Sequence, residues 1–221
     1  MFEKLQELPL LMGLSIHELM TIVEKVKFDF QKYNEGTTIV NQGDRCDKIT
    51  YILSGQICAD HRDDNRNILI SEYITETPFA LEPENLWGMK QKYTHSYTFT
   101  SDGSTCTIDK WQLSSLISDY EIVKTNILSL VCNKLQSAHQ ELNRPISATT
   151  EARLIDFVRT HSITKKGKKA IRVKMEVLAD IIDDTRLNVS RTLNNWQDKR
   201  LVEIHRGCLT IFDTERLINQ L

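Results

Sequence analysis

The sequence predicts an α+β protein: an N-terminal helix and antiparallel β-domain, then a long helix, then a basic C-terminal domain. Three observations predict this class. Short β-branched and aromatic runs separated by turn residues occupy residues 28–107, and a helical apolar pattern occupies residues 119–144. The charge balance also changes sign near residue 148. We expect three parts, at residues 1–118, 119–145 and 146–221.

Composition excludes several classes of protein. The chain has 221 residues, of which 40% are hydrophobic and 26% charged, as in a globular protein with a real core. No apolar run approaches the roughly 20 residues of a membrane helix, and the start lacks a signal peptide, so we expect a cytoplasmic protein without membrane contact. The five scattered cysteines form no CxxC pair, which argues against a disulfide framework or a zinc site. We expect Cys58, Cys106 and Cys132 to pack as small hydrophobes.

Charge is divided unevenly along the chain. Residues 1–148 carry 14 Lys and Arg against 20 Asp and Glu, a net charge of −6. Residues 149–221 carry 14 against 10, a net charge of +4. A basic C-terminal third behind an acidic body indicates that the two parts bind different partners.

The first helix and the strands have clear local signals. Ser15 and Glu18 have the spacing of a capping box, and Leu14 and Leu19 are placed as its hydrophobic staple. The expected strands are separated by turns that contain Gly, Asn or Asp, which describes an antiparallel sandwich or roll. These strands lie at residues 37–40, 49–53, 68–70, 97–99 and 105–108.

The long helix begins near Asp109 or Asp119 and ends at Arg144, before Pro145. One strip of apolar residues repeats with a spacing of three and four, as in a coiled coil, and we expect it to pair with a second copy of the helix. This dimer seam consists of Leu128, Val131, Leu135, Ala138 and Leu142. A second strip (Val123, Ile127 and Leu130) would then cover the β-domain. The alternative is that both strips are buried within one domain.

The C-terminal part contains a helix at residues 151–160 and a hairpin at residues 201–211. The lysine-rich run 165–169 is interpreted as a solvated turn inside another hairpin. Between them, Ala179, Asp183 and Val189 match the fifth, ninth and fifteenth positions of a helix-turn-helix. These positions require a small residue, a residue that tolerates a left-handed backbone and an apolar anchor.

The second helix of this motif has two distinct faces. Val189, Leu193 and Trp196 would pack on the first helix, leaving Leu187, Ser190, Arg191 and Asn194 on the opposite side. Arg191 suits guanine, Asn194 suits adenine, Leu187 suits a thymine methyl group, and Arg186 could reach a base edge or a phosphate. The predicted phosphate contacts are Lys174, Thr185, Asn188 and Arg206. Double-stranded DNA is the predicted partner.

The chain resembles the cyclic AMP receptor protein and fumarate-nitrate regulator (CRP/FNR) family of bacterial transcription factors. The resemblance rests on residues 9–15, on the glycine turns 41–44 and 54–57, on the long helix and on residues 185–193. It implies a cupin-like β-roll of the cyclic-nucleotide-binding type, a dimerisation helix and a winged helix-turn-helix that binds a palindromic operator as a homodimer. Leu187 stands where the family usually has a glutamate, so the usual half-site is not expected.

The same resemblance implies an effector pocket at Glu82, Glu84, Tyr93, Thr94 and His139. Relatives that bind cyclic AMP hold its phosphate with an arginine, but this chain has no arginine between Arg66 and Arg144. A buried phosphate would therefore lack a bidentate partner, and we do not expect cyclic AMP as the effector. Another small molecule, or loss of ligand control, fits the sequence.

Other sensor chemistries lack their residues. The first cysteine is Cys46, too late for the N-terminal cluster of the iron-sulfur relatives. His61, His95 and His139 are scattered along the chain and are interpreted as surface or partly buried residues, so neither a haem nor another metal cofactor is predicted.

The sequence leaves two alternatives to DNA binding. The chain could be a small-molecule receptor whose basic domain docks a protein, which a shallow salt dependence would reveal. An enzyme is disfavoured because no nucleophile elbow, phosphate loop or metalloprotease motif is present, and Asp183 and Asp184 are interpreted as turn residues. Activation of transcription would require a contact with RNA polymerase, for which the sequence has no marker.

Overall fold

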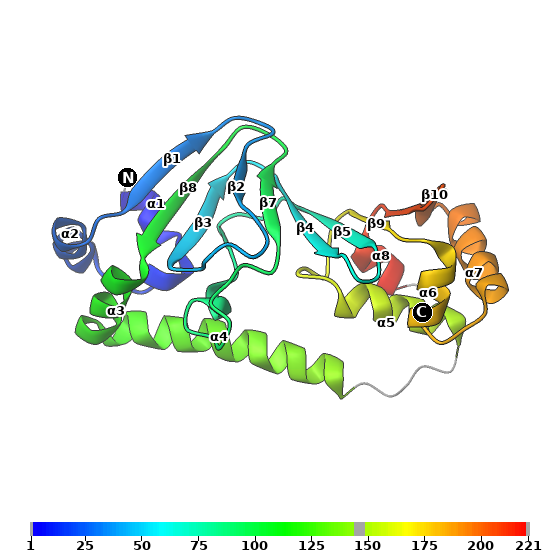
Figure 1. Ribbon diagram of the computed structural model, residues 1–221. Coiled ribbons are helices and arrows are strands. Elements are labelled where there is room, and N and C mark those ends of the chain that lie inside the picture. Colours follow the sequence, from blue (N-terminus) through cyan, green and yellow to red (C-terminus); the bar gives the residue numbers. More distant parts are fainter. Residues whose placement is uncertain (1, 144–148, 220–221) are drawn as a thin grey trace. The chain divides into compact units, whose positions relative to one another are not determined.

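The computed structural model describes residues 2–143 and 149–219, and its elements follow the order drawn in Figure 1. The chain forms two compact units. The first contains residues 1–57, 76–94 and 98–140, and the second contains residues 58–75, 95–97 and 141–221. The second unit therefore includes residues 58–75, a segment expected to belong to the N-terminal part (residues 1–118). The predicted helix end at Arg144 and stop at Pro145 lie outside the described residues.

The first unit contains most of the N-terminal elements. Its helices and strands are α1 (Phe2–Gln6), η1 (Pro9–Leu11), α2 (Ile16–Lys25), β1 (Asp29–Tyr33), β2 (Thr38–Val40), β3 (Lys48–Ser54), β6 (Phe79–Ala80), η2 (Pro83–Asn85), β8 (Gly103–Asp109), α3 (Lys110–Asp119) and α4 (Glu121–Leu142). The last residues of α4 belong to the second unit.

The second unit contains the remaining elements. They are β4 (Ile57–Asp63), β5 (Ile68–Ile74), α5 (Thr150–Thr160), β9 (Lys169–Arg172), α6 (Met175–Ile181), α7 (Arg186–Asp198), β10 (Val202–His205), β11 (Cys208–Ile211) and α8 (Thr214–Ile218). Strand β7 (Ser96–Phe99) begins in the second unit and ends in the first.

The capping box of α2 is confirmed. The Glu18 carboxylate accepts from the Ser15 amide at 2.8 Å, and the Glu18 amide donates to the Ser15 hydroxyl at 3.3 Å. Leu14 and Leu19 are both buried, as the hydrophobic staple requires. The local sequence alone is therefore enough to position the start of this helix.

Four strands of the first unit form an antiparallel sheet in the order β1-β8-β3-β6. The turn after β3 needs glycine, because Gly55 has a φ of +92° and a Cβ there would lie 2.7 Å from the Asp102 carbonyl oxygen. Cys106 is buried in this sheet, and burial raises the pKa of its thiol to about 12. Cys132 is exposed on α4, so its prediction as a core residue is wrong.

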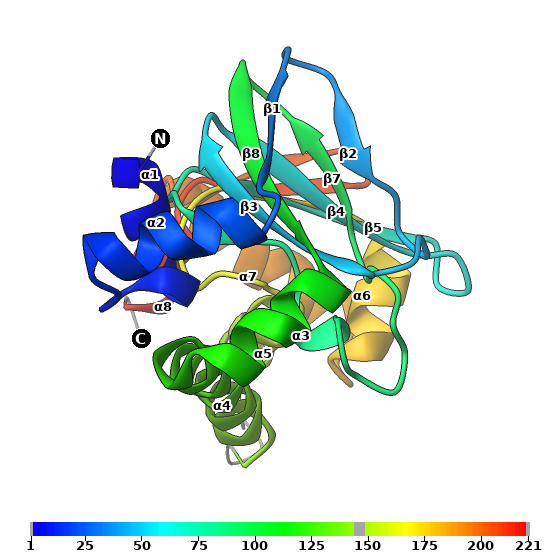
Figure 2. The same cartoon turned by 90° about the vertical axis from the view of Figure 1, so that its left-hand side faces the viewer.

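The long helix is divided into α3 and α4, which Figure 2 shows as two successive helices. Tyr120 between them has an extended backbone, and its amide caps α3 by donating to the Leu116 carbonyl at 2.9 Å. On α4, Val123 and Ile127 are buried and Leu130 is partly buried, so the second apolar strip faces away from solvent.

The dimer seam lies on the other face of α4. Leu128 is 55% exposed, Val131 37% and Leu135 68%, and Ala138 is also exposed. The Leu142 side chain lies outside the described part of the structure. Three large apolar side chains that are open to water along one helix face are a feature that a second copy could cover.

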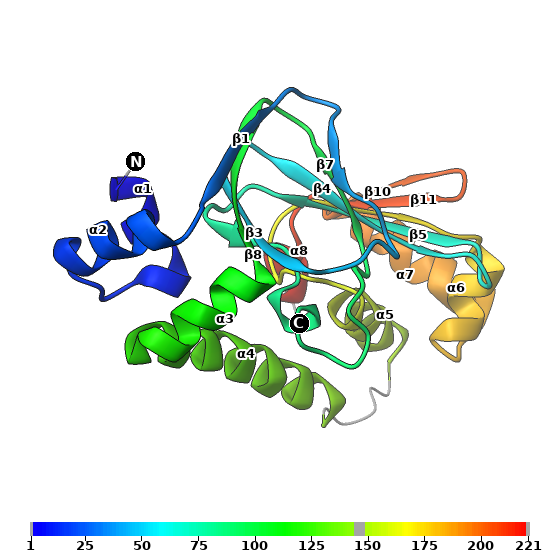
Figure 3. The same cartoon turned by 60° about the vertical axis from the view of Figure 1, so that its left-hand side comes forward.

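The second unit is built on a sheet in which strands follow the order β10-β11-β9-β5-β4-β7 (Figure 3). Strand β9 pairs with β11 on one side and with β5 on the other. The expected hairpin around residues 165–169 is therefore wrong, because β9 pairs with strands that lie far away in the sequence. The helices and the sheet share one core, and Ile68 and Ile70 of β5 pack in it with Val189, Leu193 and Trp196 of α7.

Candidate nucleic-acid interface

The helix-turn-helix consists of α6 and α7, and its turn has the predicted backbone. Ala179 and Val189 are buried, and Asp183 has a φ of +52°. The Asp184 amide donates to the Ala179 carbonyl at 3.0 Å, and the Asp183 amide donates to the Asp180 carbonyl at 3.3 Å. These two bonds form a Schellman motif with an aspartate in the position that glycine usually occupies. The turn therefore ends α6 and starts α7 within a few residues.

Helix α5 holds this turn in place. The Arg153 guanidinium donates to the carbonyl oxygens of Ile182 and Asp183. On the same helix, Glu151 accepts from the indole nitrogen of the buried Trp196 at 2.7 Å, which ties α7 to α5. Sequence reasoning missed both residues, because nothing in the local pattern shows that α5 lies beside the turn.

Asp184 organises the start of α7. Its carboxylate accepts from the Thr150 hydroxyl at 2.5 Å, from the Asn188 amide group at 2.8 Å and from the Thr185 backbone amide at 2.6 Å. These hydrogen bonds, that of Thr150 first, lower the pKa of Asp184 below its usual value. The Thr185 hydroxyl accepts from the Asn188 amide at 3.2 Å, so Thr185 is the N-cap as predicted.

The outer face of α7 agrees with the helical wheel. Val189, Leu193 and Trp196 are at most 1% exposed. On the opposite side, Leu187 is 58% exposed, and Arg191 and Asn194 are also exposed. Ser190, the fourth residue of that face, is partly buried. An apolar, a cationic and an amide side chain therefore share one face that is open to a partner.

The predicted cations differ in what they contact. Arg186 forms an ion pair with Glu176 of α6 at 3.1 Å, whereas Arg191 has no ion-pair partner among residues 2–143 and 149–219. Lys174 precedes α6, and Arg206 lies at the tip of the β10–β11 hairpin, where both are exposed. These cations come from three separate elements: the start of α6, helix α7 and the β10–β11 hairpin, which is the wing of the motif.

The lysine-rich run 165–169 is not a simple solvated turn. Lys169 is 1% exposed and pairs with Glu72, which is also 1% exposed. Burial lowers the pKa of Lys169, and the adjacent Glu72 opposes that shift. Lys165 pairs with Glu141 at 3.6 Å. The earlier interpretation is therefore wrong for Lys169, whose charge is enclosed by the fold.

The predicted effector residues come together only in part. Glu82 is buried with a φ of +40°, and its carboxylate accepts from the Thr94 amide at 2.7 Å and from the Asn85 side chain at 2.5 Å. Tyr93 is buried next to Thr94, and its hydroxyl donates to the Lys48 carbonyl at 3.4 Å. An internal carboxylate thus occupies donors that could otherwise serve an anionic ligand.

The remaining effector and sensor candidates are dispersed. Glu84 forms an ion pair with Lys134 of α4 at 2.6 Å, and His139 is exposed near the end of that helix. The rings of His61 and His95 lie 5.2 Å apart, so two histidines that are distant in the sequence are neighbours. Among the described residues, no three His, Cys, Asp or Glu side chains gather as metal ligands, and no helix could span a membrane.

Comparison with known proteins places these features in context. Residues 152–219 match the family described as the Crp-like helix-turn-helix domain. No curated protein matches the sequence. The structure is similar to the Thermus thermophilus catabolite activator protein, with a TM-score of 0.51 and 19% identity over 96% of this chain and 97% of that chain. A putative crp/fnr-family regulator from Eubacterium rectale gives 0.51 and 18% over the same shares. These two similarities confirm the predicted fold.

Proposed function

We propose that this chain, a DNA-binding transcription regulator of the CRP/FNR type, binds a palindromic operator as a homodimer and reads each half-site with the outer face of α7. The observation that carries the proposal is the exposed set Leu187, Arg191 and Asn194 on a helix whose other face is buried. Because chromosomal DNA is the partner, we also propose a cytoplasmic location.

Each residue of this face has a specific chemical role. The Arg191 guanidinium can donate two hydrogen bonds to guanine O6 and N7, and the Asn194 amide can pair with adenine N6 and N7. Leu187 has no hydrogen-bonding group, so it suits the C5-methyl group of thymine. The half-site should therefore contain G, A and T contacts and lack the cytosine contact that a glutamate at position 187 would provide.

Phosphate contacts would position α7 in the major groove. Lys174 and Arg206 are exposed cations on either side of the motif, and their contacts would carry no sequence information. Asn188 donates one side-chain amide hydrogen to Asp184, and the Thr185 hydroxyl accepts from the Asn188 backbone amide, so each would contact a phosphate through its remaining hydrogen. Arg186 would have to leave Glu176 to reach a base or a phosphate.

The homodimer follows from the exposed seam on α4. Pairing Leu128, Val131 and Leu135 with the same residues of a second copy would remove them from water. Two copies related by a two-fold axis would present two α7 helices to half-sites whose centres are about 34–36 Å apart. A Leu135→Arg substitution should therefore yield a monomer and abolish binding to the full palindrome.

The hydrogen bonds of the buried Glu82 bear on which effector the β-roll could bind. The Glu82 carboxylate accepts from Thr94 and Asn85, so an anionic ligand would have to displace it from both donors. We propose that the β-roll binds a neutral small molecule or no effector, rather than cyclic AMP. If the protein activates transcription, a surface on one of its units must also contact RNA polymerase.

The test is selection of binding sites from random DNA duplexes by the purified protein without added ligand. We expect a palindrome with half-sites one helical turn apart, and an affinity that falls steeply with salt. If no sequence is enriched and binding to DNA has a shallow salt dependence, the proposal is wrong and the basic domain docks a protein instead. Cyclic AMP added in parallel should leave the selected site and its affinity unchanged.

A further inference from the structure

The β4–β5 hairpin connects the two units through the chain itself. It belongs to the second unit, yet the residues that precede it, up to Ile57, and those that follow it, from Glu76, belong to the first. Any rearrangement of the first unit that pulls on these ends acts directly on the hairpin. We use the name DNA-binding domain for residues 149–219, which contain the helix-turn-helix. The contacts that hold the hairpin to this domain decide whether such a movement reaches it.

The first of these contacts is strand pairing. Strand β5 pairs antiparallel with β9 from Leu69 opposite Arg172 to Glu72 opposite Lys169. The bonding continues one residue further, where the Tyr73 amide donates to the Lys168 carbonyl at 3.0 Å. Such a row of backbone bonds forms and breaks cooperatively, and β9 would be an open sheet edge without it.

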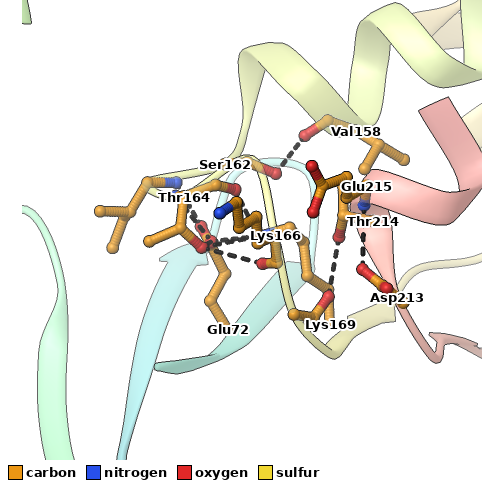
Figure 4. A network of polar contacts seen from close by, with 11 residues as sticks. Glu72, Val158, Ser162, Thr164, Lys166, Lys169, Asp213, Thr214 and Glu215 are labelled. Carbon is orange, nitrogen blue, oxygen red and sulfur yellow. Dashed lines mark hydrogen bonds and ion pairs between the residues drawn. The ribbon is translucent and has the colours of Figure 1, made fainter. Parts of the chain in front are cut away.

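The second contact is the buried polar network drawn in Figure 4. Glu72 accepts from the backbone amides of Ile163 at 2.6 Å and Thr164 at 3.2 Å, and it pairs with the Lys169 ammonium. Lys169 also donates to the Thr164 carbonyl at 2.8 Å. A buried ion pair costs desolvation energy that only its partners offset, so this network is stable as a whole and unstable in part.

The hairpin also changes the electrostatics of the domain that it joins. Residues 58–75 contain four acidic and two basic residues, a net charge of −2, whereas residues 149–221 have a net charge of +4. Pairing with the hairpin therefore gives a combined net charge of +2, half that of residues 149–221 alone. It also encloses the Lys169 charge. Both changes weaken attraction to phosphates.

The strand register places the tip of the β4–β5 hairpin at the same end of the sheet as the tip of the β10–β11 hairpin. Cys208 of β11 lies opposite Arg172 of β9, which lies opposite Leu69 of β5. Lys174 follows β9 at this end, and Asp64 lies in the turn that precedes β5. Figure 3 shows the tips of the β4–β5 and β10–β11 hairpins at the same end of the sheet. The Asp64 carboxylate, which is 87% exposed, thus lies at the same end of the sheet as Lys174, a predicted phosphate contact.

We propose that β5–β9 pairing, closed by the Glu72–Lys169 ion pair, is an autoinhibitory latch that lowers the affinity of the regulator for DNA. Opening the latch removes the hairpin from the DNA-binding domain and returns Lys169 to solvent. The proposal rests on the proposed function for its DNA readout, whereas the latch itself can be measured without DNA. It also gives the first unit a route to control DNA binding, through the two ends of the hairpin.

The release test compares Glu72→Gln with Asp64→Asn in the full-length protein. Both remove one negative charge from the hairpin, but only the first breaks the buried ion pair. Glu72→Gln should accelerate amide exchange in residues 69–72 and 169–172 and tighten binding to the selected operator by about fivefold or more relative to Asp64→Asn. Equal affinities of the two variants would overturn the proposal.

A locking test covers the case in which Glu72→Gln does not fold. Ser71 of β5 and Ala170 of β9 lie directly opposite each other. The Cα atoms of such opposite residues are close enough for a disulfide bond. The double variant S71C/A170C should bind the operator more weakly when oxidised, and reductant should restore the affinity. Unchanged affinity in the oxidised protein would show that DNA binding does not require an open latch, and the proposal would be wrong.

Failure of the proposed function gives a different result. In that case the wild-type protein selects no DNA, and the inhibitory effect of the latch is wrong as well. Amide exchange would still report the latch, since protection of β5 and β9 that is lost in Glu72→Gln requires no DNA. A wild-type protein without protection in these strands would overturn the latch directly.

Discussion

Two regions of the second unit hold charged side chains in opposite environments. Glu72 and Lys169 are 1% exposed and are held by several backbone partners. On α7 and the wing, Arg191 and Arg206 are exposed at the surface. Buried charges stabilise one arrangement of the chain, whereas exposed charges contribute little to folding and remain available to a ligand. The net charge of the chain does not distinguish a buried charge from an exposed one.

The largest expected effect lies in the buried region. Lys169→Met leaves the Glu72 carboxylate buried without its counter-charge and should lower the free energy of unfolding by about 3–5 kcal/mol. Lys165→Met is the matched control, because Lys165 is 63% exposed and its loss should cost less than about 1 kcal/mol. Urea denaturation of both variants measures the difference, and equal losses would contradict the contrast between the two regions.

A smaller effect is expected on the exposed face, and only in DNA binding. Arg191→Ala should weaken binding to the selected operator by about 1–3 kcal/mol and relax specificity at one base. The free energy of unfolding should be unchanged. Arg206→Ala should weaken binding to all sequences alike and reduce the salt slope by about one. Binding titrations on operator and random duplexes at several salt concentrations separate these roles. An Arg191→Ala variant that still discriminates fully would refute the assignment to a base.

The smallest effect concerns Asp184, which is partly buried and whose carboxylate accepts three hydrogen bonds. Because its pKa is lowered in the folded protein, its contribution to stability is present above the model-peptide value of 3.8 and is lost as the pH falls through the folded value. Wild type and Asp184→Asn should therefore differ in unfolding free energy at neutral pH and converge in acid. A difference that is independent of pH would rule out this role.

Local patterns predicted much of the candidate interface. The left-handed residue Asp183, the buried anchor Val189 and the cap Thr185 depend on neighbours within a few positions, so their roles could be read directly. The clamp from Arg153 could not, because it joins residues about thirty positions apart. For the same reason, the sequence gives no sign that the rings of His61 and His95 are neighbours.

Periodic or local signals were sufficient to predict the capping box, the strand-rich segment, the two faces of α7 and the apolar seam of α4. The pairing of β5 with β9 and the burial of Lys169 are visible only in the folded chain. A lysine in a lysine-rich turn is normally solvated, and its burial depends on Glu72, nearly a hundred residues earlier. Strand pairing over such a separation leaves no local periodicity, because the partner is chosen by packing and hydrogen bonding in the folded chain.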